Sequence, residues 1–359
     1  MALSNRRYRQ VAMLLRFISI GAIAGAIYGM GVDATLSGEV GWDGAWRGLV
    51  TGALVTIAIA GFEIFFVNDP RGQWLRRLPF MKVALLKTLF YAIAIVGMDA
   101  LGDVLVPIDG AYPIGFNLNT LITLLAALGF TFITSTIMQI NLLLGPGVLR
   151  NFIKGRYHQP RQEQRLFLFI DMRGSTAIAE RIGDIAFHRL LNQFLSDLGD
   201  VVTDHGGSID KYVGDEMIVT WRLPSRHAAG ALDAVAEARA LLAERAHVYR
   251  QRFGTAPDFR AVLHAGAVVV GEMGDQKREI ALLGDSINTT AKLEAWAKGR
   301  AADVVASRAA LDAMNPSGEK LDLPATSPHI HLTPLGPQLL PGKAQALDLF
   351  AIAFDQEKA

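Results

Sequence analysis

The chain has 359 residues, enough for two or more domains of about 150 residues each. Its net charge is only +1, which argues against a general nucleic-acid binder, because such a protein would carry a strongly basic domain. Hydrophobic residues make up 51% of the chain and charged residues 19%, and the apolar excess lies before Gly145. Cysteine is absent, so disulfides and thiolate metal sites are excluded.

Four apolar runs precede Gly145, and each reaches the roughly 20 residues that a helix needs to cross a bilayer. One such run could be a buried helix of a soluble protein, but four in series argue against that interpretation. The runs span residues 11–32, 45–67, 82–106 and 117–144. The sequence therefore predicts a domain of four transmembrane helices over residues 1–145.

Basic residues cluster in every second connection, which orients these helices by the excess of Lys and Arg in cytoplasmic loops. They precede the first run, separate the second from the third, and follow the fourth, so both termini are predicted to be cytoplasmic. The first run contains Arg16 and ends without a small-residue cleavage site, so it is not interpreted as a signal peptide. The clusters are Arg6, Arg7 and Arg9; Arg71, Arg76, Arg77 and Lys82; and Arg150, Lys154 and Arg156.

Ionisable groups within the apolar runs are hypotheses for sensing or transport, because a charge inside a bilayer is costly. Glu63 and Asp99 are the stronger candidates, whereas Lys87 and Asp103 lie close enough to helix ends to snorkel to the interface. Small residues at a spacing of four on the first run permit close helix contact, either between subunits or within the bundle. These are Gly21, Gly25 and Gly29.

A basic segment over residues 146–165 leads out of the membrane, where it can lie on an anionic leaflet or couple helix movement to the domain beyond. From residue 166 to 359, strand-like and helix-like segments alternate, which predicts an α/β or α+β domain with a central sheet. Predicted strands cover residues 166–170, 208–221 as a hairpin, 259–274 and 278–284, and predicted helices cover residues 175–206, 228–254 and 286–299.

Two carboxylates end strand-like segments, Asp171 in RLFLFIDMRGST and Asp215 in GGSIDKYVGDEMIVTW. Mg²⁺ is held by one or two carboxylates together with phosphate oxygens and water, and two ions can clamp the attacking and leaving oxygens of an in-line displacement. A helix predicted to begin near Ser175 would add free N–H groups at the same place. The pattern predicts a site for a nucleoside triphosphate, with the alternative that Gly214 and Asp215 form only a type I′ hairpin turn.

Other polar residues are assigned to structure. Glu216 should face away from the site if the strand alternates from Asp215 onward. His264 lies in an apolar strand and is predicted to be a satisfied core histidine. His329 and His331 alternate like one face of a strand, and no third metal ligand is evident beside them.

Four motifs in order resemble the catalytic domain of class III nucleotidyl cyclases, the adenylate/guanylate cyclase family. They are RLFLFIDMRGST, DKYVGDEMIVTW, HAGAVVVGEMG and LLGDSINTTAKLE, and the resemblance runs from about Leu166 to about Phe354. It implies a ferredoxin-like α/β domain that works as a head-to-tail homodimer with active sites at the subunit interface. The membrane half is similar to that of membrane-bound bacterial members, which implies the bacterial inner membrane.

The resemblance implies that Asp171 and Asp215 bind two Mg²⁺ or Mn²⁺ ions per active site, with the Met172 carbonyl as a further ligand. The backbone from residue 173 to 176 would cradle the triphosphate. The nucleotide-binding residues implied on this side of the site are Arg173, Gly174, Ser175, Thr176 and Gly214.

From the partner subunit, Lys211 matches the lysine that contacts the purine, and Asn288 matches the asparagine that positions the ribose. The implied reaction is attack of the 3′-hydroxyl on the α-phosphorus, which gives a cyclic nucleotide and pyrophosphate. Position and charge are the main contributions of the protein to such a reaction.

Three positions depart from the family pattern. Lys292 stands where the family has an arginine. Lysine keeps the positive charge near the transferring phosphate but lacks the planar guanidinium that binds phosphate through two hydrogen bonds. Ala281 occupies the second purine-selecting position and cannot bond a base. Pro341 replaces a basic residue, although Lys343 is near in the sequence. Loss of such a charge contact costs about 3 kcal/mol, and a lysine should cost less than full removal.

These features predict a slow, membrane-bound adenylate cyclase that makes cyclic AMP for intracellular signalling, with ATP favoured through Lys211. The alternatives are guanylate cyclase activity on GTP, or a regulatory cyclase-like domain that binds nucleotide with low activity. A receptor or transporter with a secondary soluble domain is a third class. Membrane lipid and an unidentified ligand of the membrane domain are the other expected partners, and nucleic acid is not.

Overall fold

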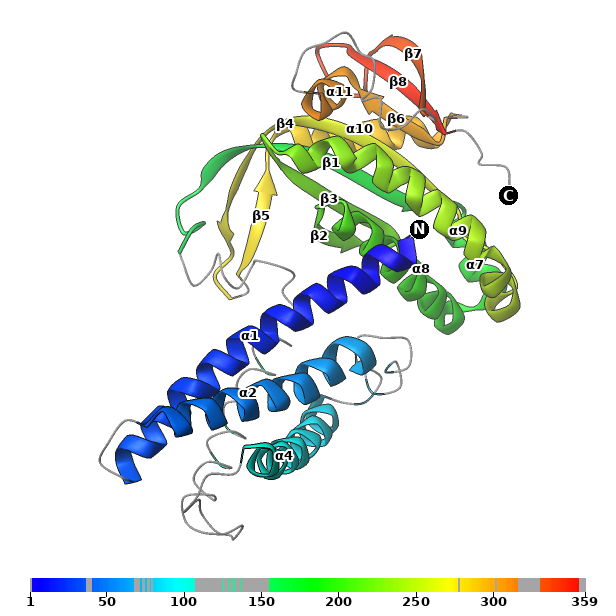
Figure 1. Ribbon diagram of the computed structural model, residues 1–359. Helices are drawn as coiled ribbons and strands as arrows, with labels where there is room; N and C mark the ends of the chain where they lie inside the picture. The colour runs from blue at the N-terminus through cyan, green and yellow to red at the C-terminus, as the bar shows by residue number, and fades with distance from the viewer. Residues whose placement is uncertain are drawn as a thin grey trace. The chain divides into compact units, whose positions relative to one another are not determined.

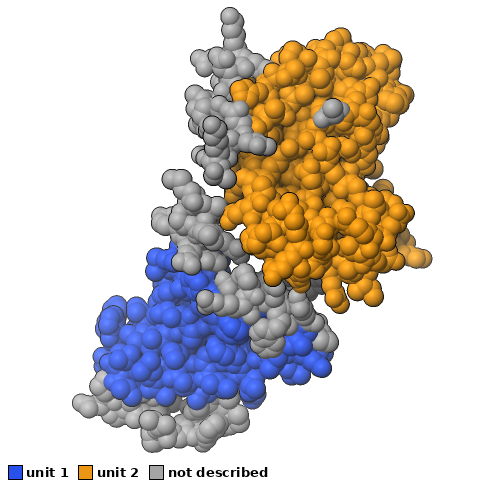
Figure 2. Space-filling model, turned by 90° about the vertical axis from the view of Figure 1, so that its right-hand side faces the viewer, with its two compact units in different colours: residues 1–140 blue, residues 141–359 orange. Residues whose placement is uncertain are grey.

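The computed structural model describes residues 2–36, 41–67, 80–106, 155–276, 278–300, 302–315 and 330–354, with isolated positions between 72 and 136. The chain divides into two compact units, Met1–Ile140 and Asn141–Ala359 (Figure 2).

The first unit consists of long apolar helices (Figure 1). Three segments in the described part of the chain are long and apolar enough to cross a membrane, which confirms the first three predicted runs as helices. The fourth predicted helix, residues 117–144, lies almost wholly outside the described residues, so a bundle of four stays a prediction. The elements are α1 (Ala2–Leu36), α2 (Trp42–Phe62), the π-helical turn η1 (Glu63–Val67) and α4 (Phe80–Leu105).

Glycines bring the backbones of α1 and α2 into contact. A Cβ atom on Gly25 would lie 2.1 Å from the carbonyl oxygen of Gly48, and one on Gly29 would lie 1.9 Å from that of Gly44. No side chain fits at such a distance, and small residues are what allow membrane helices to approach this closely. Contact within the bundle therefore accounts for the glycine stripe on α1.

An ion pair connects η1 to α4. The ammonium of Lys87 donates to Glu63 Oε1 at 2.7 Å, and the hydroxyl of Tyr91 donates to the same oxygen. Lys87 is 8% exposed and Tyr91 is 2% exposed. The prediction that Lys87 snorkels is wrong, because its ammonium has a carboxylate partner on the neighbouring helix. Glu63 is thereby compensated inside the helix packing.

The second unit is an α/β domain built on one sheet, which has eight strands in the described part of the chain. Its strands are β1 (Arg161–Met172), β2 (Ser208–Val213), β3 (Glu216–Leu223), β4 (Phe259–Met273), β5 (Glu279–Leu283), β6 (Val304–Ser307), β7 (Ile330–Gln338) and β8 (Leu347–Phe354). Its helices are α7 (Ser175–Ile182), α8 (Asp184–Asp204), the 3₁₀ turn η3 (Arg226–Gly230), α9 (Ala231–Phe253), α10 (Asp285–Lys298) and α11 (Arg308–Met314).

The strand order is β2-β3-β1-β4-β6-β8-β7, with β5 paired to β4. Chain order β1, α8, β2, β3, α9, β4 gives the antiparallel order β2-β3-β1-β4, which is the split βαβ arrangement of the predicted ferredoxin-like fold. Strand β6 runs parallel to β4, so the complete sheet is mixed.

Helices cover both faces of β1. Leu166, Leu168 and Ile170 belong to the core that includes buried residues of α8 and α9, whereas Phe167 and Phe169 pack in a second core with buried residues of α10. A strand buried on both faces shows a continuous apolar run instead of an alternating pattern. The apolar run therefore predicted the strand, but it did not indicate which side chains lie on which face of the sheet.

Two boundaries differ from the predicted ones. Strand β1 begins at Arg161 and not at Leu166, because its polar first residues pair with the far end of β4, Arg161 with Val270 and Arg165 with Gly266. The predicted helix over residues 175–206 is two helices, α7 and α8, since Gly183 between them has a φ of 80°.

Candidate active site

Asp171 lies near the end of β1 with its carboxylate on the face covered by α10. It is 6% exposed. Its register partners are Glu216 on β3 and Arg260 on β4. Side chains directly opposite one another in an antiparallel pair project from the same face of the sheet. The charged side chains of Asp171, Glu216 and Arg260 therefore lie on the face that α10 covers.

Asp215 lies in the two-residue turn that joins β2 to β3, and it is half-buried. Gly214 has a φ of 63°, whereas no described residue other than glycine has a positive φ. A type I′ turn needs positive φ at both central positions, so Gly214 and Asp215 do form the hairpin turn between β2 and β3, but it is not of type I′. The Asp215 carboxylate is close enough to Asp171 to raise its pKa, so the fold brings the two predicted acids together.

Burial is the main cause of the raised pKa of the Asp171 carboxyl. The ammonium of Lys298 acts in the opposite direction, and the carboxylates of Glu294 and Asp215 raise the pKa further. A buried acid with other acids around it holds its charge at a cost, and a bound cation would relieve that cost.

Glu216 lies in the site, contrary to the prediction that it faces away. Because Asp215 belongs to the turn, the alternation of β3 begins at Glu216, and this residue pairs directly with Asp171. Burial, followed by the carboxylates of Glu294 and Asp171, raises the pKa of Glu216 to about 7. One buried side-chain oxygen of Glu216, Oε1, has no hydrogen-bond partner.

Two further residues of the site, Glu294 and Lys298, come from α10, and sequence reasoning missed both. The Lys298 ammonium lies 3.3 Å from Asp171 Oδ1 and 2.8 Å from Glu294 Oε1. Glu294 is 9% exposed. The spacing of four residues could have indicated the pair, but that spacing is common on solvated helix faces and does not point to a site.

These residues fit a divalent cation that also binds phosphate. The donors are hard carboxylate oxygens, the ligands that Mg²⁺ prefers, and the ammonium of Lys298 already places a positive charge among them. Among the residues described, no three acidic or imidazole side chains are close enough to hold a metal ion by themselves. The set therefore suits an ion whose remaining ligands are phosphate oxygens and water, with Asp171 and Asp215 as the protein ligands.

The turn after β1 leaves fewer backbone N–H groups for phosphate than the sequence predicted. Met172 ends the strand at 2% exposure, and Gly174, with a φ of 64°, begins α7 without a side-chain cap. The Arg173 N–H donates to the carbonyl of Asp258 at 2.8 Å, so this amide is already engaged. The N–H groups at the start of α7, from Ser175 onward, lack a capping side chain and suit an anion.

The two residues expected to serve the partner subunit are both exposed. Lys211 is exposed on β2, and Asn288 is exposed near the start of α10. Asn288 precedes Lys298 by ten residues, which is about 15 Å along a helix. Asn288 therefore lies well away from the end of α10 that contacts Asp171 of the same chain.

Two lysines at or near the positions that depart from the family pattern already have partners within the chain. Lys292 donates to the carbonyl of Gly342 at 2.9 Å, and Lys343 lies 2.5 Å from Asp285. Ala281 on β5 is 6% exposed, and its methyl side chain offers no polar group to a ligand.

Two of the three histidine predictions fall on described residues, and both agree with the structure. His264 is 7% exposed and its Nδ1 lies 2.8 Å from the hydroxyl of Ser307, which confirms a satisfied core histidine. His331 lies on β7 and is exposed, whereas His329 is outside the described residues.

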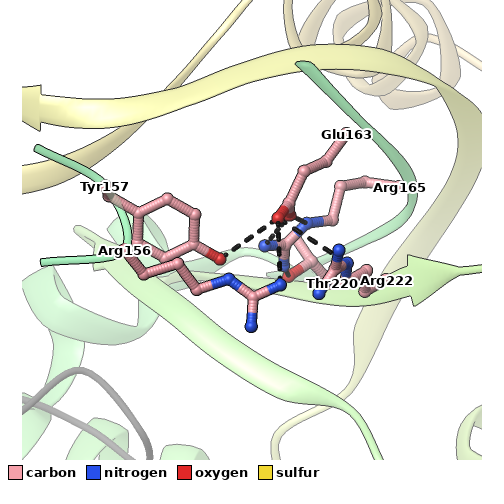
Figure 3. Close-up of polar contacts among 6 residues, drawn as sticks. All are labelled: Arg156, Tyr157, Glu163, Arg165, Thr220 and Arg222. Atoms are coloured by element: carbon pink, nitrogen blue, oxygen red, sulfur yellow. Dashed lines mark hydrogen bonds and ion pairs between the residues drawn. The ribbon is translucent and has the colours of Figure 1, made fainter. Parts of the chain in front are cut away.

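A second polar cluster surrounds Glu163, near the start of β1 (Figure 3). The Glu163 carboxylate is 2.7 Å from Arg165, 3.6 Å from Arg222 and 3.8 Å from Arg156. It also accepts a bond of 3.3 Å from the Tyr157 hydroxyl. Tyr157 and Arg156 precede the strand, so the cluster fastens the segment that enters the domain to β1 and β3.

Comparison with known families identifies this architecture. The family described as Adenylate and Guanylate cyclase catalytic domain matches residues 157–345, a range that includes both aspartates, the α7 turn and α10. The chain therefore belongs to the adenylate and guanylate cyclase family.

Related proteins carry names that fit this family. Adenylate cyclase 2 of Rhizobium meliloti (strain 1021) is 38% identical over 179 residues, which are 50% of this chain and 48% of that protein. An adenylate cyclase of Anabaena cylindrica is 30% identical over 140 residues, 36% of this chain and 27% of that protein. The matched region thus spans less than half of each relative. A bacterial light-regulated adenylyl cyclase has the same fold, with a TM-score of 0.53 at 18% identity over 66% of each chain.

Proposed function

We propose that the chain is a membrane-anchored adenylate cyclase that converts ATP to 3′,5′-cyclic AMP and pyrophosphate at a homodimer interface. The observation that carries the proposal is the pairing of the Asp171 and Asp215 carboxylates beside the uncapped start of α7. Membership of the cyclase family supports a role for these two acids in the cyclisation of a nucleoside triphosphate.

Asp171 and Asp215 would hold two Mg²⁺ or Mn²⁺ ions, with the Met172 carbonyl as a further ligand. When bound, such ions lower the pKa of the 3′-hydroxyl and neutralise the leaving phosphates. The N–H groups at the start of α7 and at Gly174 bind the triphosphate. They fix the α-phosphorus in line with the ribose hydroxyl, and such positioning accounts for much of the rate of phosphoryl chemistry.

The partner subunit completes the site. Lys211 of the partner subunit contacts the purine, Asn288 of the partner subunit orients the ribose, and Lys292 of the partner subunit meets the charge that develops on the phosphate. The 3′-oxygen forms a bond to the α-phosphorus, the bond to pyrophosphate breaks, and the hydroxyl proton passes to solvent. A lysine supplies a point charge where a planar fork would bind two oxygens, which favours a slow enzyme.

ATP is the favoured substrate, and GTP is the alternative. The relative with 38% identity carries the name adenylate cyclase, which supports ATP. The apolar Ala281 side chain provides no hydrogen bond to either base. Lys211 is then the main polar contact to the purine.

Membrane anchoring rests on the three apolar helices of the first unit. Both termini lie in the cytoplasm on the distribution of basic residues, and the setting is the bacterial inner membrane. Lipid is the immediate partner of these helices, and an apolar ligand would be the signal that reaches them.

The test is cyclic nucleotide formation by the full-length protein in detergent, with ATP and GTP in parallel and with Mg²⁺ or Mn²⁺. We expect cyclic AMP and pyrophosphate in equal amounts, and we expect Asp171→Asn to lower the rate by at least about a hundredfold. Equal rates for wild type and Asp171→Asn with both nucleotides would contradict an enzymatic role.

The second candidate is a regulatory domain that binds nucleotide without turnover, which Lys292 and Ala281 favour. The variant Lys292→Arg separates the two. A rise in rate, up to about tenfold, is expected for a slow enzyme whose charge contact is restored. Nucleotide binding with no turnover in either protein would favour the regulatory role.

A further inference from the structure

Lys298 brings a positive charge into the site proposed for the metal ions. Its ammonium lies 3.3 Å from Asp171 and 2.8 Å from Glu294, and its side chain is 48% exposed. It is the last residue of α10, and Gly299 follows it directly. The charged end is thus held by two carboxylates while the side chain remains open to solvent.

The surroundings of Lys298 are strongly acidic. Asp171, Glu216 and Glu294 converge at this end of the sheet, and Asp215 adds to the field at Asp171. Gathered carboxylates repel one another in a poorly solvated place, so a counter-ion stabilises the arrangement. Among the described residues, Lys298 is the cation in contact with both Asp171 and Glu294.

We propose that Lys298 is a resident cation of the metal site, which occupies the Asp171 carboxylate in the metal-free protein and is displaced when a divalent ion binds there. This inference rests on the proposed function, since it takes Asp171 as a metal ligand. Lys298 is a positioning residue that acts through Asp171 and Glu294. Glu294 lies four residues earlier on the same helix and retains the ammonium after its displacement.

Two consequences follow. Lys298 keeps the carboxylates from repelling one another before the metal arrives, and it lowers the affinity for metal, because the incoming ion must replace an existing ion pair. The half-exposed position of its side chain makes the exchange feasible, since the ammonium can move into water without passing through the core.

The experiment is a titration of the full-length protein in detergent with Mn²⁺ alone, with free Mn²⁺ followed by electron paramagnetic resonance. Removing the competing charge in Lys298→Met should tighten Mn²⁺ binding about five- to tenfold, the size expected for one partly screened charge at close range. Lys298→Arg, which keeps the charge, should bind nearly as the wild type does.

A matched control is Lys343→Met, which removes one positive charge from an ion pair with Asp285 outside the metal site. We expect its Mn²⁺ affinity to equal that of the wild type. Lys298→Gln provides a second neutral variant if Lys298→Met does not fold. The rise in melting temperature on adding Mn²⁺ should also be larger for the neutral variants than for the wild type.

The outcomes distinguish failure of the role proposed for Lys298 from failure of the proposed metal site. If Asp171→Asn abolishes Mn²⁺ binding but Lys298→Met and Lys298→Gln bind no more tightly than wild type, the resident-cation role is overturned while the metal site stands. Weaker binding by the neutral variants would also overturn it and would make Lys298 an aid to binding. If Asp171→Asn leaves Mn²⁺ binding unchanged, both the inference and the proposed metal site fall.

Discussion

Burial changes the pKa values of single residues in this domain. Glu216 and His264 both lie on the central strands, and both have pKa values displaced toward their uncharged forms. Burial is the first cause in each case, because a poorly solvated environment disfavours charge. For Glu216 neighbouring acids add to the effect, whereas for His264 the ammonium of Lys343 opposes protonation and Asp285 favours it.

We predict that His264 makes the domain sensitive to acid. Its pKa falls from 6.5 to about 4 in the folded chain, so the unfolded chain binds a proton that the folded chain does not. Stability is therefore present above about pH 6.5 and is lost as the pH falls toward about 4, by at most about 3 kcal/mol.

The variant His264→Gln can keep a hydrogen bond to Ser307 but cannot titrate. Its melting temperature, measured in detergent by intrinsic fluorescence across this pH window, should fall less steeply than that of the wild type. Parallel curves for the two proteins would show that other groups control the acid response.

At the scale of elements, β1 connects the entry of the domain to its candidate site. Glu163 near its start binds arginines from three places in the chain, and Asp171 near its end binds Lys298. In the sheet register Arg165 lies directly opposite Arg222. Like charges directly opposite one another destabilise a strand pair, so the carboxylate between them is needed for this register.

We predict that Glu163→Gln lowers the free energy of unfolding by about 2 kcal/mol, because it removes the counter-charge from Arg165, whose side chain is 13% exposed. Thermal unfolding of the full-length protein in detergent measures this loss. The exposed Glu180 on α7 offers a matched control, and Glu180→Gln should change stability by less than about 0.5 kcal/mol. Equal effects of the two substitutions would show that the Glu163 cluster contributes little.

At the scale of the whole molecule, one chain does not bring all the predicted site residues together. Asp171 contacts Lys298 at the C-terminal end of α10, and Asn288 lies near the other end of that helix. A symmetric dimer can supply the missing groups twice, since each chain gives and receives the same set. We therefore predict that the proposed enzyme is active only as a dimer.

We predict that two inactive variants restore activity to each other. Asp171→Asn and Asn288→Ala chains, mixed and allowed to exchange subunits, form heterodimers with one intact site, so the mixture should recover up to about a quarter of the wild-type rate. A mixture of Asp171→Asn with Asp215→Asn is the control, because both changes fall on the same half of the site. No recovery in the first mixture, with heterodimers shown by differently tagged chains, would contradict a shared site.

Much of the fold could be read from the sequence because the patterns that mark elements are local. Apolar runs of about 20 residues predicted the membrane helices, and a short apolar run followed by Asp171 predicted the central strand. The turn at Gly214 and the order of the motifs likewise depend on neighbouring residues. The two aspartates and the helix start near Ser175 belong to this locally encoded part.

Only the tertiary structure decided which distant residues meet. Strand register put Glu216 opposite Asp171, and the packing of α10 brought Lys298 to the same carboxylate. Helix packing in the first unit gave Lys87 a partner that its sequence position did not indicate. Each of these contacts depends on how two separate elements align, and the periodicity of one element carries no information about its partner. The sequence by itself thus determined most of the elements up to α10 and the two aspartates of the site, and the fold decided which other charges surround them.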